Sequence, residues 1–173
     1  MNQRNWFKAS TPSERSGDIL VSFDARWRAP LIEHPISSVL RRRVPKSFAP
    51  RRMYLYVGSP HSHILGHADV KDVSSLSLQE GLRALPTTGV TESELRAYFT
   101  GYPNIGCYLI GPVVTFARPL SRQELHAQSG FSPPQSFVAL SFRASEWLAQ
   151  HALSVPPRGG ASSVPRNTKR SAR

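Results

Sequence analysis

Six basic side chains and no acidic one lie between positions 34 and 68. They flank two short runs, 38–40 and 53–57, that are β-branched or aromatic and end in turn residues, which is typical of strands. Guanidinium groups held on strands beside tyrosine rings suit contacts with phosphates and bases. Charge on a sheet edge also prevents aggregation, and composition favours neither interpretation. The six are Arg41, Arg42, Arg43, Lys46, Arg51 and Arg52.

The whole chain is also basic, with a formal net charge of +11 over 173 residues. Such a charge favours polyanionic partners, either nucleic acid or an anionic membrane surface. Nearly half of the excess lies in residues 152–173, which hold five basic side chains and no acidic one. This Pro-, Gly- and Ser-rich tail is expected to be disordered and to contact nucleic acid nonspecifically through Arg166, Lys169, Arg170 and Arg173.

The cellular setting follows from what the chain lacks. A single cysteine, Cys107, excludes an internal disulfide, and its apolar neighbours predict a buried, unreactive thiol. No apolar stretch reaches the ~20 residues of a membrane span, and the N-terminus lacks the apolar core of a signal peptide. We expect a soluble cytoplasmic protein with no membrane contact.

The pattern of the chain predicts a flexible segment over residues 1–17, one domain over 18–151 and a disordered tail over 152–173. Many short strands and few helices favour an α+β, mainly β fold: a partly open β-barrel with peripheral helices. Expected strands span 19–23, 37–43, 52–58, 64–73, 107–116 (bent at Gly111) and 136–140. Expected helices span 27–32, 76–85, 91–99, 121–127 and 144–152.

Local signals refine these elements. A capping box joins Ser121 to Glu124 at the start of a helix. Gly66 allows a bulge or a close backbone approach inside its strand. Alternation along 37–43 would place Arg41 and Arg43 on one face and Arg42 on the other, so that only part of the basic patch faces one ligand.

Other chemistry finds weaker support. His61, His63 and His67 form a local cluster, but apart from Asp69 no carboxylate or cysteine nearby supplies further metal ligands. The sequence has neither a Gly-x-Ser-x-Gly elbow nor a Gly-rich phosphate loop. We therefore predict no metal site and no cofactor.

Several segments carry motifs in an order that is familiar from one family. Together they resemble the ASCH domain, a branch of the PUA-like superfamily, over residues 18–142. The segments are 19–23 (Ile-Leu-Val-Ser-Phe), the aromatic helix at 27–32, 54–60 (Tyr-Leu-Tyr-Val-Gly-Ser-Pro), 64–70 (Ile-Leu-Gly-His-Ala-Asp-Val), 98–101 (Tyr-Phe-Thr-Gly), 106–110 and 133–137 (Pro-Pro-Gln-Ser-Phe).

The resemblance implies a PUA-like barrel with a cleft between the first helix and the basic second strand. Such clefts are thought to hold RNA or a nucleobase-like ligand, and some family members are amidohydrolases on acylated cytidine or ribonucleases. Their Gly-x-Lys-x-x-Glu-x-Arg type segment overlays His34 to Arg41. Ile36 and Val39 occupy the positions of the catalytic-type Lys and Thr or Glu, and neither side chain can move a proton or attack a carbonyl.

The prediction is thus a noncatalytic RNA- or nucleotide-binding module. The alternatives are a hydrolase acting on a modified nucleoside or on RNA, and a transcription-associated protein interaction domain. Arg41 is the leading candidate for an anionic or base-edge contact, followed by Arg43. Trp27 either stacks on a base or anchors its helix, and Tyr56 either lines the cleft or fills the barrel. Further hydrogen-bonding candidates are Ser22, Ser59, Gln135 and Ser136.

Overall fold

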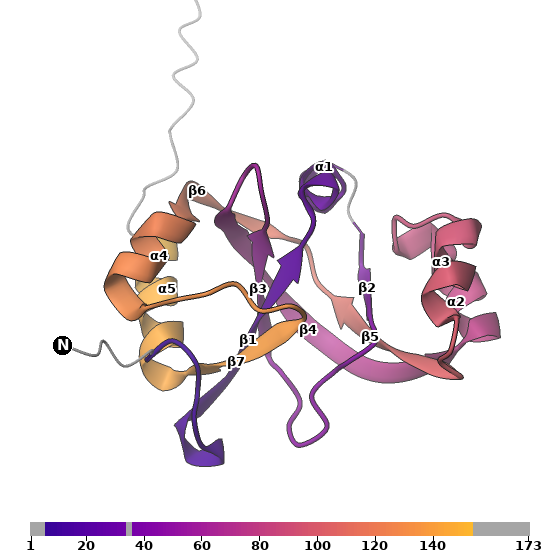
Figure 1. The fold of residues 1–173 in the computed structure, drawn as a ribbon, viewed down its shortest axis with the longest axis horizontal. Coiled ribbons are helices and arrows are strands. Elements are labelled where there is room, and N and C mark those ends of the chain that lie inside the picture. Colours follow the sequence, from indigo (N-terminus) through magenta and orange to yellow (C-terminus); the bar gives the residue numbers. More distant parts are fainter. Residues whose placement is uncertain (1–5, 34–35, 154–173) are drawn as a thin grey trace, which may run out of the picture.

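The computed structural model describes residues 6–33 and 36–153. Seven strands form one curved sheet in the order β2-β5-β4-β3-β1-β7, with β6 paired to β4 (Figure 1). Because the edge strands β2 and β7 are not paired with each other, the barrel is partly open, as the sequence predicts. The strands are β1 (Arg15–Phe23), β2 (Ser38–Arg41), β3 (Arg52–Val57), β4 (His63–Ser77), β5 (Asn104–Ile110), β6 (Val114–Ser121) and β7 (Phe137–Ser141).

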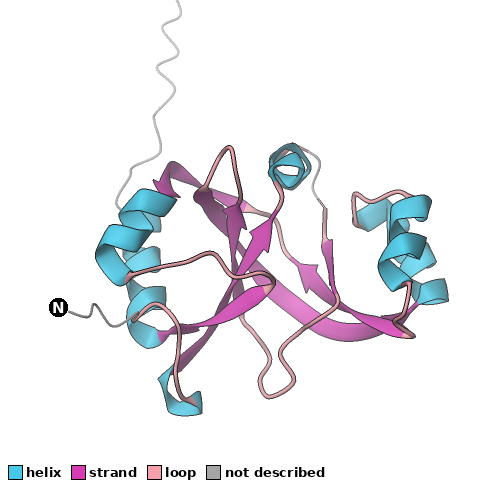
Figure 2. Cartoon of the chain, viewed as in Figure 1, coloured by secondary structure: helices cyan, strands magenta, loops and turns pink. Residues whose placement is uncertain are grey.

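The helices lie around the sheet rather than within it (Figure 2). The helices α4 and α5 lie at one end, α2 and α3 lie at the other, and α1 lies between them (Figure 1). Among the described helices, none combines the length and apolar character that crossing a membrane requires. The helices are α1 (Arg28–Ile32), α2 (Leu78–Ala84), α3 (Glu92–Phe99), α4 (Arg122–Ser129) and α5 (Phe142–Leu153), with short 3-10 turns η1 (Pro12–Glu14), η2 (Ala25–Trp27) and η3 (Leu85–Thr87).

Strand β1 is the centre of the fold because both of its faces are covered. Ile19 and Val21 point into the barrel interior, while Leu20 packs in a second cluster with residues of α4 and α5. A third cluster packs α3 against β2 and β5 through Leu95 and Leu40. A strand buried on two faces reads as a continuous apolar run, which is the pattern of residues 19–23.

Polar side chains fix where three helices begin. The predicted box at α4 is confirmed: Ser121 Oγ accepts from the Glu124 N–H at 3.2 Å, and Glu124 accepts from the Ser121 N–H at 3.0 Å. Thr91 and Glu94 form the same box at α3. A third box, at the start of α2, was not predicted. Each box satisfies backbone donors that a helix start otherwise leaves free.

The predicted strand 107–116 is in fact two strands. β5 pairs with β2 and β4, whereas β6 pairs with an earlier part of β4, so the chain turns over Gly111 instead of bending within one strand. Gly66 explains how β6 can approach. A Cβ built at Gly66 would lie 2.2 Å from the Val114 carbonyl oxygen, which confirms the predicted close backbone approach.

The flexible segment predicted for residues 1–17 is wrong for residues 6–17. The Phe7 side chain is 1% exposed and packs beneath β7, where the Ser141 N–H donates to the Phe7 carbonyl at 3.1 Å. β1 begins at Arg15, four residues before the predicted strand. Two aromatic side chains, Trp6 and Phe7, supply enough apolar surface to dock this polar segment. The predicted disordered tail, 152–173, is wrong for its first two residues, which end α5, and its remaining residues, 154–173, lie outside the described residues, as do residues 1–5.

Gly66→Ala should destabilise the fold, because the added methyl group would push β6 away from β4. Overpacking of this kind costs roughly 1–3 kcal/mol. Gly58→Ala is the matched control, since its Cβ would meet only the Phe23 carbonyl oxygen at 3.4 Å. Urea unfolding should show a clear loss of unfolding free energy for Gly66→Ala alone. Equal stability of the two variants would contradict the close packing of β6 on β4.

Candidate functional site

An open cavity of about 570 Å³ lies between the end of β1, η2, the edge strand β2 and α3. Its walls combine four arginines and two carboxylates with apolar and aromatic side chains. The lining residues are Ser22, Phe23, Asp24, Arg26, Trp27, Ile36, Ser38, Val39, Leu40, Arg41, Arg42, Arg43, Thr88, Val90, Glu94, Leu95, Tyr98, Tyr102, Gln135 and Ser136.

Arg41, the last residue of β2, reaches across the cavity floor to β1. One terminal nitrogen donates to the Leu40 carbonyl at 2.8 Å, and the other donates to the Ser22 carbonyl at 3.0 Å. The guanidinium carbon lies 4.4 Å from the centroid of the Phe23 ring. These contacts connect two strands that are not neighbours in the sheet.

The charge of Arg41 has no direct counter-ion among the described residues. It belongs to none of their ion pairs, and the two carbonyl oxygens use only two of its five N–H donors. Burial lowers the pKa of the guanidinium, and the nearby Tyr98, Tyr108 and Asp24 partly oppose that shift. Arginine remains charged at neutral pH, so the cavity holds a half-buried cation with unused donors.

Arg42 forms a different arrangement on the α3 side of the cavity. Its guanidinium carbon lies 4.8 Å from the Tyr98 ring centroid and 4.7 Å from that of Tyr102. Its Nε donates to the Tyr98 carbonyl at 3.2 Å, and its backbone N–H donates to the Tyr98 hydroxyl at 3.1 Å. The two tyrosines thus hold Arg42 at the rim of the cavity by cation–π and hydrogen-bond contacts.

A second connection joins η2 to α3. Arg26 forms an ion pair and hydrogen bond with Glu94 and also lies over the Trp27 ring at 5.0 Å. Hydrogen bonding from the Thr91 backbone, together with Arg26, lowers the pKa of Glu94 to about 2. Glu94 is therefore a fixed anion that serves the helix cap and this ion pair, and it cannot act as a general acid near neutral pH.

Comparisons with known proteins identify the architecture. No family model matches the sequence, and no curated protein sequence matches it. Among solved structures, the ASCH protein from Zymomonas mobilis superposes with a TM-score of 0.70 and 20% identity, covering 78% of this chain and 94% of that one. This chain has the ASCH fold. The N-terminal domain of McrB from Staphylothermus marinus is more distant, with a TM-score of 0.52, 12% identity and coverage of 87% and 98%.

The ASCH fold confirms the resemblance seen in the sequence and brings most of the predicted site residues together. Six of them line the one cavity: Ser22, Trp27, Arg41, Arg43, Gln135 and Ser136. The predicted split of the arginines between two faces is wrong. β2 ends at Arg41, so strict alternation stops there, and Arg42 lines the same cavity as its two neighbours.

Two predicted site residues lie elsewhere. Tyr56 is 3% exposed and packs 5.6 Å from Phe131, between ring centroids, in the cluster beneath α4 and α5. It therefore fills the core, which is one of the two roles considered for it. Ser59 is exposed in the turn after β3 and does not line the cavity. Trp27 packs on the barrel core and also lines the cavity, so its predicted role in stacking on a base stays a prediction.

The two positions at which the family resemblance expects catalytic-type side chains both line this cavity. Ile36 and Val39 both line it, and both also belong to the buried core of the barrel. Within the described part of the chain, no group of three His, Cys, Asp or Glu side chains is placed to hold a metal ion. Sequence reasoning missed Glu94 and Tyr98 of α3 and also Tyr102, three residues after that helix, all of which lie more than fifty residues from β2 in the chain.

Glu94→Gln should change stability in a pH-dependent way. Because the folded pKa of about 2 lies below the ordinary value of 4.5, the carboxylate stabilises the fold above about pH 4.5. That contribution is lost as the pH falls through about 2. The difference in unfolding free energy between the wild type and Glu94→Gln should therefore shrink as urea titrations move from about pH 5 to about pH 3. A difference that stays constant over this range would contradict the role assigned to Glu94.

Proposed function

We propose that the cavity binds one nucleotide unit of RNA, or a free nucleotide, without catalysing a reaction. The observation that carries this proposal is the half-buried Arg41 guanidinium, which lines the cavity with unused donors and no ion-pair partner in the described structure. A buried charge without a counter-ion costs free energy in the empty protein. An anionic or base-edge ligand would supply the missing acceptors.

The shape and chemistry of the cavity also suit a nucleotide. Its volume of about 570 Å³ falls within the range of about 300–1,000 Å³ that is usual for small-ligand sites. Trp27 and Tyr102 are partly exposed in its walls and offer ring faces for a base to stack on. Gln135 and Ser136 add polar groups of the kind that read a base edge.

The side chains that line the cavity also disfavour catalysis. Among the described lining residues, none is a lysine, histidine or cysteine, the types that most readily act as a base or nucleophile near neutral pH. Ile36 and Val39 stand where the family resemblance expects the catalytic-type side chains. Glu94 is held as an anion. These features favour a site that binds a ligand and leaves it intact.

Arg41→Met is the direct test of this proposal. Replacing Arg41 should weaken binding of ribonucleoside 5′-monophosphates, followed by NMR titration, and of an eight-nucleotide RNA, followed by fluorescence anisotropy. Loss of a charge-assisted hydrogen bond is worth about 1.5–3 kcal/mol, so the affinity should fall at least about tenfold. Arg83→Met, an exposed arginine on α2 that does not line the cavity, should bind as the wild type does.

Two further variants complete the test. A quadruple variant of the full chain should weaken RNA binding less than Arg41→Met does. Its substitutions are Arg166→Ser, Lys169→Ser, Arg170→Ser and Arg173→Ser. Binding that disappears with the tail charges and ignores Arg41 would contradict the cavity site. Incubation with N-acylated cytidine and with short RNAs should give no product, and turnover that persists through repurification would overturn the noncatalytic assignment. Thermal unfolding checks that every variant is folded.

A further inference from the structure

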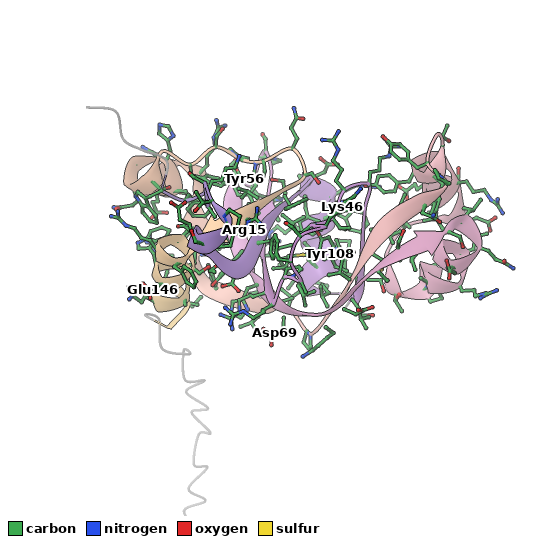
Figure 3. All side chains as sticks on the ribbon, turned by 90° about the horizontal axis from the view of Figure 1, so that it is seen from below. Arg15, Lys46, Tyr56, Asp69, Tyr108 and Glu146 are labelled. Carbon is green, nitrogen blue, oxygen red and sulfur yellow. The ribbon has the colours of Figure 1, made fainter. Side chains whose placement is uncertain are left out.

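A second hollow lies next to the cavity and carries its own positive charge. It has a volume of about 480 Å³ and lies between the segment before η1, the start of β1, the loop joining β2 to β3, and β7. Its basic lining residues are Lys8, Arg15 and Lys46, and none of its lining residues is acidic. Arg15 and Lys46 are labelled in Figure 3, which views the molecule from the side on which this loop projects.

The cavity and the second hollow are adjacent at two places, where one residue of the chain lines the cavity and the next residue lines the second hollow. Arg43 lines the cavity and the next residue, Val44, lines the second hollow. In the same way, Ser136 lines the cavity and Phe137 lines the second hollow. The segments 43–44 and 136–137 therefore form a shared boundary between the cavity and the second hollow.

The cations along this route are available for a ligand. Lys8, Arg43 and Lys46 are exposed, and none of them belongs to an ion pair within the described chain. Arg15 is held in position, because one terminal nitrogen donates to Ser47 Oγ at 2.9 Å and its guanidinium lies 5.3 Å from the Phe48 ring centroid.

Glu14, the carboxylate next to Arg15 in the sequence, already accepts hydrogen bonds from the backbone. One Glu14 oxygen accepts from the Ser10 N–H at 2.7 Å, and Glu14 does not line the second hollow. Phe48 and Phe137 are only partly buried and form part of the floor. One held arginine over an aromatic ring and two exposed lysines, without an acidic side chain in the lining, form a surface that suits a single-stranded backbone.

We propose that the second hollow is an extended subsite for single-stranded RNA. One nucleotide occupies the cavity, the strand passes Arg43, and its following phosphates are bound by Arg15, Lys46 and Lys8. This inference rests on the proposed function of the cavity and adds to it the class of ligand: an oligonucleotide rather than a free nucleotide. A duplex does not fit this arrangement, because a paired base cannot enter the cavity while the backbone crosses Arg43.

The test uses the full-length double variant Lys8→Gln/Lys46→Gln, in which both changed side chains are exposed. Its affinity for an eight-nucleotide single-stranded RNA should fall, and the slope of log affinity against log salt should become shallower by about 1.4, since each lost phosphate contact contributes about 0.7. Binding of ribonucleoside 5′-monophosphates should not change. The control is Lys71→Gln/Arg122→Gln, which removes two exposed cations that lie outside both hollows and should leave both affinities unchanged.

The outcomes separate this subsite from the cavity itself. If the RNA affinity of Lys8→Gln/Lys46→Gln equals that of the wild type while Arg41→Met still weakens both ligands, the subsite is wrong and the cavity stands. If Arg41→Met affects neither ligand, the proposed function fails, and the subsite fails with it. Equal affinity of the wild type for a duplex of the same sequence would also overturn the single-strand track.

Discussion

The Arg41 guanidinium lies where the barrel is open, and the arrangement of the site depends on it. β1 and β2 are not neighbours in the sheet, yet Arg41 on β2 donates to the Ser22 carbonyl on β1 and covers the Phe23 ring. Desolvation of this charge is unfavourable and lowers its pKa. The protein therefore maintains a half-buried cation that two carbonyl oxygens satisfy only in part. Sites of this kind are candidates for function, because structural stability alone gives little reason to keep them.

The rest of the cavity follows from how other elements are held around this charge. The Arg26–Glu94 ion pair connects η2 with α3, and the two tyrosines of the α3 region hold Arg42 at the rim. Ile36 and Val39 provide an apolar part of the cavity wall. The cavity is therefore positively charged and partly aromatic, and the carboxylate of Glu94 is committed to the cap of α3.

The sequence was sufficient for the features that depend on local patterns. The apolar run 19–23, the capping box of Ser121 with Glu124 and the close approach at Gly66 each have a short-range physical cause, and each was confirmed. Arg41 was also predicted, because its strand and its position within the family-like segment could be seen without the structure. The ASCH resemblance supplied the barrel that brings Gln135 and Ser136 to the same cavity.

The features that sequence reasoning missed depend on long-range packing. Nothing near Arg42 indicates that Tyr98 and Tyr102 would hold it, because those residues approach only when α3 packs on β2 and β5. Because β2 ends at Arg41, strand alternation does not continue, and Arg42 lines the cavity instead of facing away from it. Tyr56 faces the cluster under α4 and α5. Because both faces of its strand are buried, the sequence is apolar on both, and it does not indicate which face a given residue takes. The polar composition of residues 6–17 predicts flexibility, but the buried Phe7 side chain anchors this segment on the core.

The account can be tested most directly by observing the Arg41 side chain while RNA binds. The Nε–Hε NMR signal of Arg41, assigned by its absence in Arg41→Met, should shift and become protected from exchange as the eight-nucleotide single-stranded RNA is added. An unchanged Arg41 signal, with shifts confined to arginines outside the cavity, would contradict the claim that this guanidinium receives the ligand.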